Sequence, residues 1–117
     1  DKFFINYSIF KIPKNNKNFN NSYHLYPLLI DFKKIKMTKN KLINFFLKNN
    51  IKLQVHYIPL HTQKYFKRKY NFKDIDFPNS IKFYNEALSI PIFYGVKLKT
   101  IKKFSKLLLD FIKQNQL

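Results

Sequence analysis

One six-residue segment, HYIPLH at positions 56–61, concentrates the side chains that are most able to do chemistry. It holds two of the three histidines, a tyrosine and a proline. An imidazole or a phenol at the end of a strand can hydrogen-bond a sugar hydroxyl or a phosphate oxygen. The same side chains also occur half-buried with one satisfied polar end, so a structural and a functional interpretation both remain open.

Metal chemistry is not supported by the three imidazoles. His56 and His61 lie on either side of a proline rather than on one helical face, and no carboxylate is near them in sequence. His24 belongs to the segment SYHLY, whose alternation is typical of a strand face. Zinc sites need three or four ligands at defined spacings, so we predict no metal site.

Nucleophilic catalysis is equally unsupported, and no catalytic residue is predicted. The chain has no cysteine and no Gly-x-Ser-x-Gly elbow. Its single glycine, Gly95, cannot form a loop that cradles a phosphate group. Asp74 and Asp76 could act as a carboxylate pair, but their position in a polar loop predicts solvated surface groups.

Four segments that could position the HYIPLH residues are predicted to be extended. They are rich in aromatic and branched residues and bounded by proline or polar turns: 9–13, 22–32, 51–57 and 89–93. Pro27 predicts an edge position or a bulge for the second of them. Pro59 is expected to stop the third, and this places His56 and Tyr57 at the end of a strand.

Three amphipathic helices are predicted from apolar residues at helical spacing, over about 38–49, 79–88 and 99–115. Thr38 and Thr100 are expected to cap the first and the last. A basic segment at 62–70 predicts a helical turn, and the Asn-rich stretch 14–21 predicts a loop. This order suits a single α+β domain over residues 1–117, with helices packed on one face of a small sheet.

The net charge of +17 would ordinarily point to nucleic acid or an anionic surface. All but one of the 23 basic residues are lysines, however, and they are spread along the chain. Arginine, which reads bases through its planar fork, occurs only at Arg68. Codon bias in an AT-rich genome explains this profile, so solvated lysines are the preferred interpretation and a small basic nucleic-acid-binding module is the alternative.

Compartment and completeness are predicted from simple features. No apolar run approaches the roughly 20 residues that span a bilayer, and no signal peptide opens the chain. The absence of cysteine fits a cytoplasmic protein. Residue 1 is not methionine, so a fragment or a processed product is expected.

Three blocks of the sequence resemble the C-terminal part of the DegT/DnrJ/StrS sugar aminotransferases. They are SYHLYPLLIDF at 22–32, IKLQVHYIPLHTQKYF at 51–66 and DFPNSIKFYNEALSIPIFYGV at 76–96. The similarity is greatest to the branch of UDP-4-amino-4,6-dideoxy-N-acetyl-L-altrosamine transaminases of pseudaminic acid-type pathways. It covers roughly residues 22 to 115.

This resemblance implies the small C-terminal domain of a fold-type I enzyme that depends on pyridoxal 5'-phosphate (PLP). The complete enzyme would move an amino group from glutamate to a nucleotide-linked 4-keto-6-deoxy sugar, as a homodimer. The family's Schiff-base lysine precedes a Gly-Glu-Gly-Gly run, which this chain lacks. The resemblance therefore implies that the large cofactor-binding domain is absent, that the fragment alone holds no cofactor, and that it is inactive in isolation.

The resemblance also gives the HYIPLH segment a role at the mouth of the active site. His56, Tyr57 and His61 are the residues carried over, as substrate contacts only. Tyr65 is a further, weaker candidate. The two flanking blocks are expected to be framework.

Overall fold

A computed structural model describes residues 1–14, 18, 20 and 22–115 of the chain. Its centre is a three-stranded antiparallel sheet in the order β1-β2-β3. The strands are short: β1 spans Phe10–Lys11, β2 spans Tyr26–Ile30 and β3 spans Ala87–Ile90. Of the predicted loop 14–21, residues 14, 18 and 20 lie outside helices and strands, and the others fall outside the described residues.

The central strand β2 contains Pro27, which the sequence predicted at an edge or a bulge. Pro27 is paired with Ser89 of β3. The backbone N–H and C=O of Ser89 both bond to Gln54 on the far side of β3, so they point away from β2. Pro27 therefore also points its nitrogen away from β3, toward the side where β1 reaches only Leu29 and Ile30. The N–H that Pro27 lacks would therefore face a side of β2 on which no strand is paired at this position. Pro27 thus lies at a locally unpaired edge, as predicted, although β2 is the central strand of the sheet.

The segment 51–57 was predicted to be a strand, and this prediction is largely wrong. Only Gln54 makes a bridge, to Ser89 at the outer edge of β3. The side chains still alternate, since Leu53 is buried and Val55 half-buried while Lys52 and Gln54 are exposed. The apolar pattern thus identified an extended segment, but its single bridge to Ser89 is too little pairing to form a strand of the sheet.

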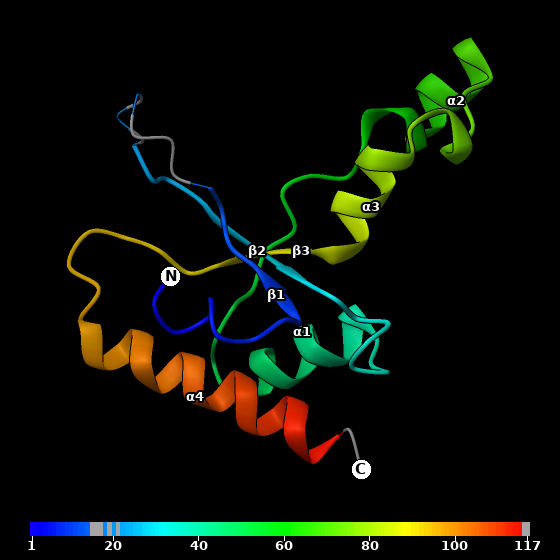
Figure 1. Cartoon of the computed structure of the whole chain (residues 1–117). Coiled ribbons are helices and arrows are strands. Elements are labelled where there is room, and N and C mark those ends of the chain that lie inside the picture. Colours follow the sequence, from blue (N-terminus) through cyan, green and yellow to red (C-terminus); the bar gives the residue numbers. More distant parts are fainter. Residues whose placement is uncertain (15–17, 19, 21, 116–117) are drawn as a thin grey trace.

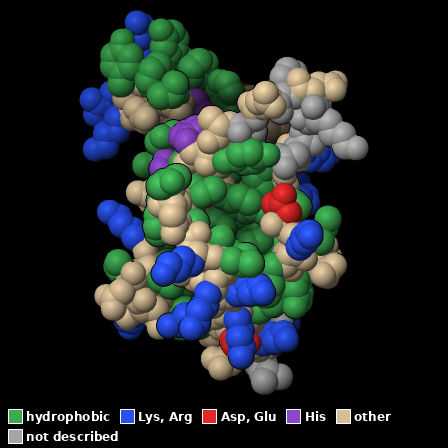
Figure 2. Space-filling view, turned by 90° about the vertical axis from the view of Figure 1, so that its left-hand side faces the viewer, with side chains coloured by type: hydrophobic (Ala, Val, Ile, Leu, Met, Phe, Trp, Pro, Cys, Tyr) green, Lys and Arg blue, Asp and Glu red, His purple; other side chains and the backbone are tan. Residues whose placement is uncertain are grey.

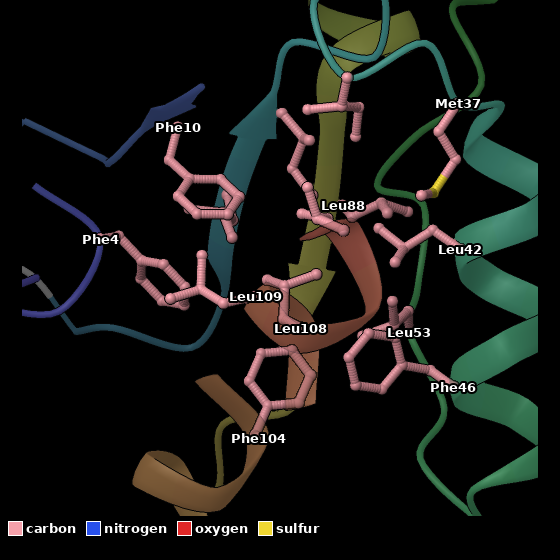
Figure 3. Close-up of a cluster of buried hydrophobic side chains, with 14 residues drawn as sticks. Phe4, Phe10, Met37, Leu42, Phe46, Leu53, Leu88, Phe104, Leu108 and Leu109 are labelled. Atoms are coloured by element: carbon pink, nitrogen blue, oxygen red, sulfur yellow. The ribbon is translucent and has the colours of Figure 1, made fainter. Parts of the chain in front are cut away.

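Two helices, α1 (Lys39–Lys48) and α4 (Leu98–Gln114), cover one face of the sheet (Figure 1). Phe46 of α1 packs against Phe104 of α4, with ring centres 4.8 Å apart, and Phe45 stacks on Phe111 at 3.7 Å. Figure 3 shows how these helices meet the sheet and the N-terminal phenylalanines in one apolar cluster. The predicted α+β class, with helices on one face of a small sheet, is confirmed.

The ends of these elements follow the local sequence in some places and not in others. Thr38 caps α1 as predicted, and its side chain accepts from the backbone N–H of Lys41 at 3.2 Å. Asn50 closes the same helix in the left-handed region, with φ of 58°. Thr100 does not cap α4, because that helix already begins at Leu98 and Lys97 is its N-cap.

Helix α3 (Pro78–Glu86) ends earlier than the predicted 79–88, and β3 begins at once. Leu88 pairs with Leu28 and is almost fully buried there. The gain from burying this leucine in the sheet outweighs its local preference for helix.

Residues 60–86 form an arm that projects from the body of the molecule (Figure 1). The arm consists of the short turns η1 (Leu60–Thr62) and η2 (Asp74–Asp76) and the helices α2 (Lys64–Tyr70) and α3. Neither α2 nor α3 contributes a buried residue, so the helical layer on the sheet consists of α1 and α4. Over the described residues, no helix combines the length and apolarity of a membrane span.

Candidate functional site

The HYIPLH segment connects the sheet to the arm, and its three predicted site residues separate along it. His56 is half-buried, and its Nδ1 lies 2.8 Å from the hydroxyl oxygen of Ser89 in β3. Its Nε2 has no hydrogen-bond partner among the described residues and is not buried. The ring is thus tied to the sheet at one nitrogen and open at the other.

Tyr57 turns outward, with 73% of its surface exposed. Its ring lies 4.8 Å from the His56 ring, centre to centre, in a T-shaped arrangement. The peptide bond between the two residues is cis. A large aromatic side chain this exposed offers both an apolar face and a phenol to a ligand.

His61, in contrast to Tyr57, is buried, with 6% of its surface exposed. Its ring stacks on Phe77 at 4.4 Å, and its Nε2 lies 3.8 Å from Oδ1 of Asp74. Lys67 approaches the same carboxylate at 3.8 Å. The distance from His61 is too long for a hydrogen bond, so this imidazole serves as a packing centre of the arm within the described chain.

The arm carries aromatic rings and cations side by side. Phe77, Phe72, Tyr70 and Phe66 follow one another at centre distances of 5.1, 5.2 and 6.2 Å. Tyr65, the weaker candidate, is exposed, and Lys69 donates to its hydroxyl at 3.2 Å. Figure 2 shows histidine side chains between this hydrophobic arm, at the top, and a body whose lower part carries many lysines.

Sequence reasoning missed Ser89, which it treated as framework in a short extended piece. Ser89 also borders a shallow pocket of about 240 Å³ together with His24, Lys52 and Gln54. His24 is exposed there rather than fixed in a strand, because β2 begins only at Tyr26. No local signal marks Ser89, since its partner His56 lies 33 residues earlier in the chain.

Lys39 is a second residue with unusual properties that sequence reasoning missed. Burial lowers its pKa from 10.5 to about 8, and its Nζ donates to the carbonyl oxygen of Tyr84. The ammonium also lies 4.8 Å from the centre of the Tyr84 ring. Lys39 thus connects the start of α1 to the arm.

A PLP site needs a lysine free to react, donors for a phosphate group and a partner for the pyridine nitrogen. Lys39 has the lowered pKa, but its amine is engaged by Tyr84, and it borders none of the pockets described here. Lys39 therefore does not fit the role of the reactive lysine. Within the described residues, no three His, Cys, Asp or Glu side chains come together as a metal site would require.

Two curated proteins are similar to parts of this chain. It is 32% identical over 94 residues to the spore coat polysaccharide biosynthesis protein SpsC of Bacillus subtilis, which covers 79% of this chain and 24% of SpsC. It is 37% identical over 81 residues to the uncharacterized protein MJ1066 of Methanocaldococcus jannaschii, which covers 69% and 21% of the two chains. The chain therefore spans only about a quarter of the length of these relatives or less.

Solved structures share its fold. PseC of Helicobacter pylori, an aminotransferase involved in the biosynthesis of pseudoaminic acid, superposes with a TM-score of 0.82 over 97% of this chain and 30% of its own, at 22% identity. The PLP-form of the sugar aminotransferase Spr1654 from Streptococcus pneumoniae, described as putative, gives 0.80 over 97% and 29%, at 17% identity. Both contain this fold as a minor part of a longer chain.

The model of one protein family matches residues 5–108, which include the three strands of the sheet, the HYIPLH segment and the whole arm. These matches do not favour the nucleic-acid alternative. Because this family match covers most of the chain, the chain belongs to the DegT/DnrJ/EryC1/StrS aminotransferase family.

Proposed function

We propose that residues 1–117 are the small domain of a PLP-dependent aminotransferase that moves an amino group from glutamate to a nucleotide-linked 4-keto-6-deoxy sugar. Family membership supports transfer of an amino group to a sugar. The names of SpsC and PseC, which refer to polysaccharide and pseudoaminic acid biosynthesis, support the sugar substrate. Within this function, we favour the branch that makes UDP-4-amino-4,6-dideoxy-N-acetyl-L-altrosamine.

The cofactor is assigned to the rest of such an enzyme. The chain lacks the Gly-Glu-Gly-Gly run that follows the family's Schiff-base lysine, its only glycine is Gly95, and the amine of Lys39 is engaged by Tyr84. We therefore assign no step of the amino-group transfer to residues of this chain, and its isolated form is expected to be inactive. A homodimer and a cytoplasmic location belong to the same proposal.

The observation that carries this chain's role is the open half of the His56 ring beside the exposed Tyr57. An imidazole nitrogen and a phenol at this position can hydrogen-bond a sugar hydroxyl or a diphosphate oxygen. His61 belongs to the same prediction, but its burial against Phe77 favours an indirect contribution through the shape of the arm. The cations of the arm would attract a doubly charged nucleotide-sugar as a secondary effect.

The apolar surface of the chain fits an incomplete site. A groove of about 600 Å³ runs between α4, the segment 90–96 and residues 49–52, and most of its lining is apolar. Phe93 in this groove is largely exposed. We propose that the remainder of the enzyme covers this groove and buries its apolar lining.

The test is His56→Ala in the complete enzyme, with His24→Ala as the matched control. We expect the KM for the UDP-linked 4-keto sugar to rise about tenfold or more, as for a lost hydrogen bond to a charged group. PLP absorbance after gel filtration is expected to stay unchanged, and so is the KM of the control. Loss of bound PLP with an unchanged sugar-nucleotide KM would refute the assignment.

A further inference from the structure

Ser89 is held firmly in the sheet at a point where its side chain meets the candidate site. Its backbone N–H and C=O both bond to Gln54, at 2.8 and 3.1 Å. The residue is 5% exposed. The hydroxyl oxygen is 2.8 Å from Nδ1 of His56. The side chain therefore has a fixed direction, and that direction is toward the imidazole.

Within the described residues, this contact is the only side-chain hydrogen bond that Ser89 makes. The geometry allows two arrangements, in which either the hydroxyl donates to Nδ1 or Nδ1–H donates to the hydroxyl. The second arrangement leaves a buried hydroxyl proton with no acceptor. A buried unsatisfied donor is unfavourable by more than the average hydrogen bond contributes, so the first arrangement is preferred.

We infer that Ser89 is a positioning residue that holds His56 in the tautomer with the proton on Nε2. In this tautomer the hydroxyl of Ser89 donates to Nδ1. Nε2–H then points away from the sheet as a hydrogen-bond donor. Its orientation is set by the strand pairing of β3 with Gln54 rather than by the connecting segment itself.

This inference rests on the proposed function for its ligand, but not for its geometry. A neutral N–H donor with a fixed direction suits an oxygen of a sugar or a diphosphate, because these oxygens are acceptors. Fixing the ring in advance also removes part of the ordering cost of binding. Ser89 would thus act on the affinity for the nucleotide-sugar without touching it.

The direct test is neutron diffraction from deuterium-exchanged crystals of the protein at pH 8, where an ordinary histidine is neutral. We expect deuterium on Nε2 of His56 and on the Ser89 oxygen, directed at Nδ1. Deuterium on Nδ1 of His56 would overturn the inference. This measurement needs no variant, so it cannot be confused with a folding defect.

The functional test uses Ser89→Ala in the complete enzyme, with Ser89→Thr as the conservative variant. Ser105→Ala is the matched control, since Ser105 is also a buried serine (1% exposed) but its hydroxyl has no partner among the described residues. Loss of one neutral hydrogen bond is expected to raise the sugar-nucleotide KM about three- to tenfold. The value of kcat should change less than about twofold, Ser89→Thr should restore KM, and Ser105→Ala should leave it unchanged.

The outcomes separate this inference from the proposed function. If His56→Ala raises KM but Ser89→Ala does not, Ser89 has no positioning role and the inference is wrong. If neither variant changes KM while the neutron structure shows Nε2–D, the tautomer assignment is correct and the substrate role of this segment fails. If kcat and the thermal midpoint fall together with KM in Ser89→Ala, and Ser89→Thr does not restore them, the role is structural and the inference is overturned.

Discussion

The ammonium of Lys39 lies over the ring of Tyr84 and donates to the carbonyl oxygen of the same residue. This contact joins the first turn of α1 to the last turns of α3, and so joins the body to the arm. Burial removes this ammonium partly from water, which favours the neutral amine.

The first prediction concerns the pH dependence of stability. Burial lowers the pKa of Lys39 to about 8 in the folded chain, against 10.5 ordinarily. Between these values the unfolded chain binds more protons, so this group's contribution to the unfolding free energy rises as pH increases from about 8 to about 10.5. Lys39→Met should remove that rise, whereas Lys41→Met, at an exposed position of the same helix, should keep it. Urea unfolding at several pH values in this window measures the difference, and equal pH slopes in the two variants would contradict the assignment.

The second prediction concerns the cap of α1. Thr38→Ala removes the side-chain acceptor for the N–H of Lys41, and we expect a loss of about 1 kcal/mol of stability. Thr100→Ala removes a threonine of α4 that caps nothing and should change stability by less than about 0.5 kcal/mol. Both are measured from urea midpoints. Similar losses in the two variants would mean that the loss at Thr38 is not due to capping.

The third prediction is a stabilising change at the start of α4. Lys97 is the N-cap of this helix, has the extended backbone that N-caps favour, and provides no side-chain bond. Lys97→Asp should raise stability by about 1 kcal/mol through a cap bond and a favourable charge at the N-terminus. Lys102→Asp makes the same charge change within the helix and serves as the control. A gain of equal size in both would attribute the effect to net charge alone.

The fourth prediction addresses the layer between α1 and the rest of the core. Phe46 is fully buried, whereas the adjacent Leu47 is 59% exposed. Phe46→Ala is expected to destabilise the fold by about 3–5 kcal/mol, and Leu47→Ala by less than about 0.5 kcal/mol. Denaturation followed by circular dichroism distinguishes these values. A small effect at Phe46 would contradict the packing of α1 on α4.

The fifth prediction separates the arm from the body. His61→Ala removes the ring that stacks on Phe77 and should loosen residues 60–77 without altering the core. Limited proteolysis by trypsin should then cut faster in the lysine-rich α2, while the global unfolding midpoint changes little. His24→Ala is the control. Unchanged cleavage in His61→Ala would show that the stack does not hold the arm.

The parts of the fold that sequence predicted are those decided by neighbouring residues. The 3.6-residue periodicity of α1 and α4, and the cap at Thr38, are local features, and they could be recognised from spacing and residue type. The start of β3 could not be predicted, because Leu88 favours a helix until its pairing with Leu28 is known. The same limit applies to Pro27, whose tolerance depends on where β1 ends.

The candidate site divides in the same way. Residue type alone singled out the HYIPLH segment, in which Tyr57 is largely exposed and His56 is half-buried. The burial of His61 depends on Phe77, a contact that no local pattern contains. Ser89 is a common residue in an unremarkable strand, and only the pairing of that strand with Gln54 brings it to His56.

The arm has no buried residue in either of its helices, whereas the core is closed by the sheet, α1 and α4. Most surface substitutions change stability only slightly. Mutations in the arm are therefore tolerated by the fold while they alter the surface next to His56. The sequence of the arm can therefore drift at little cost to the scaffold beneath it.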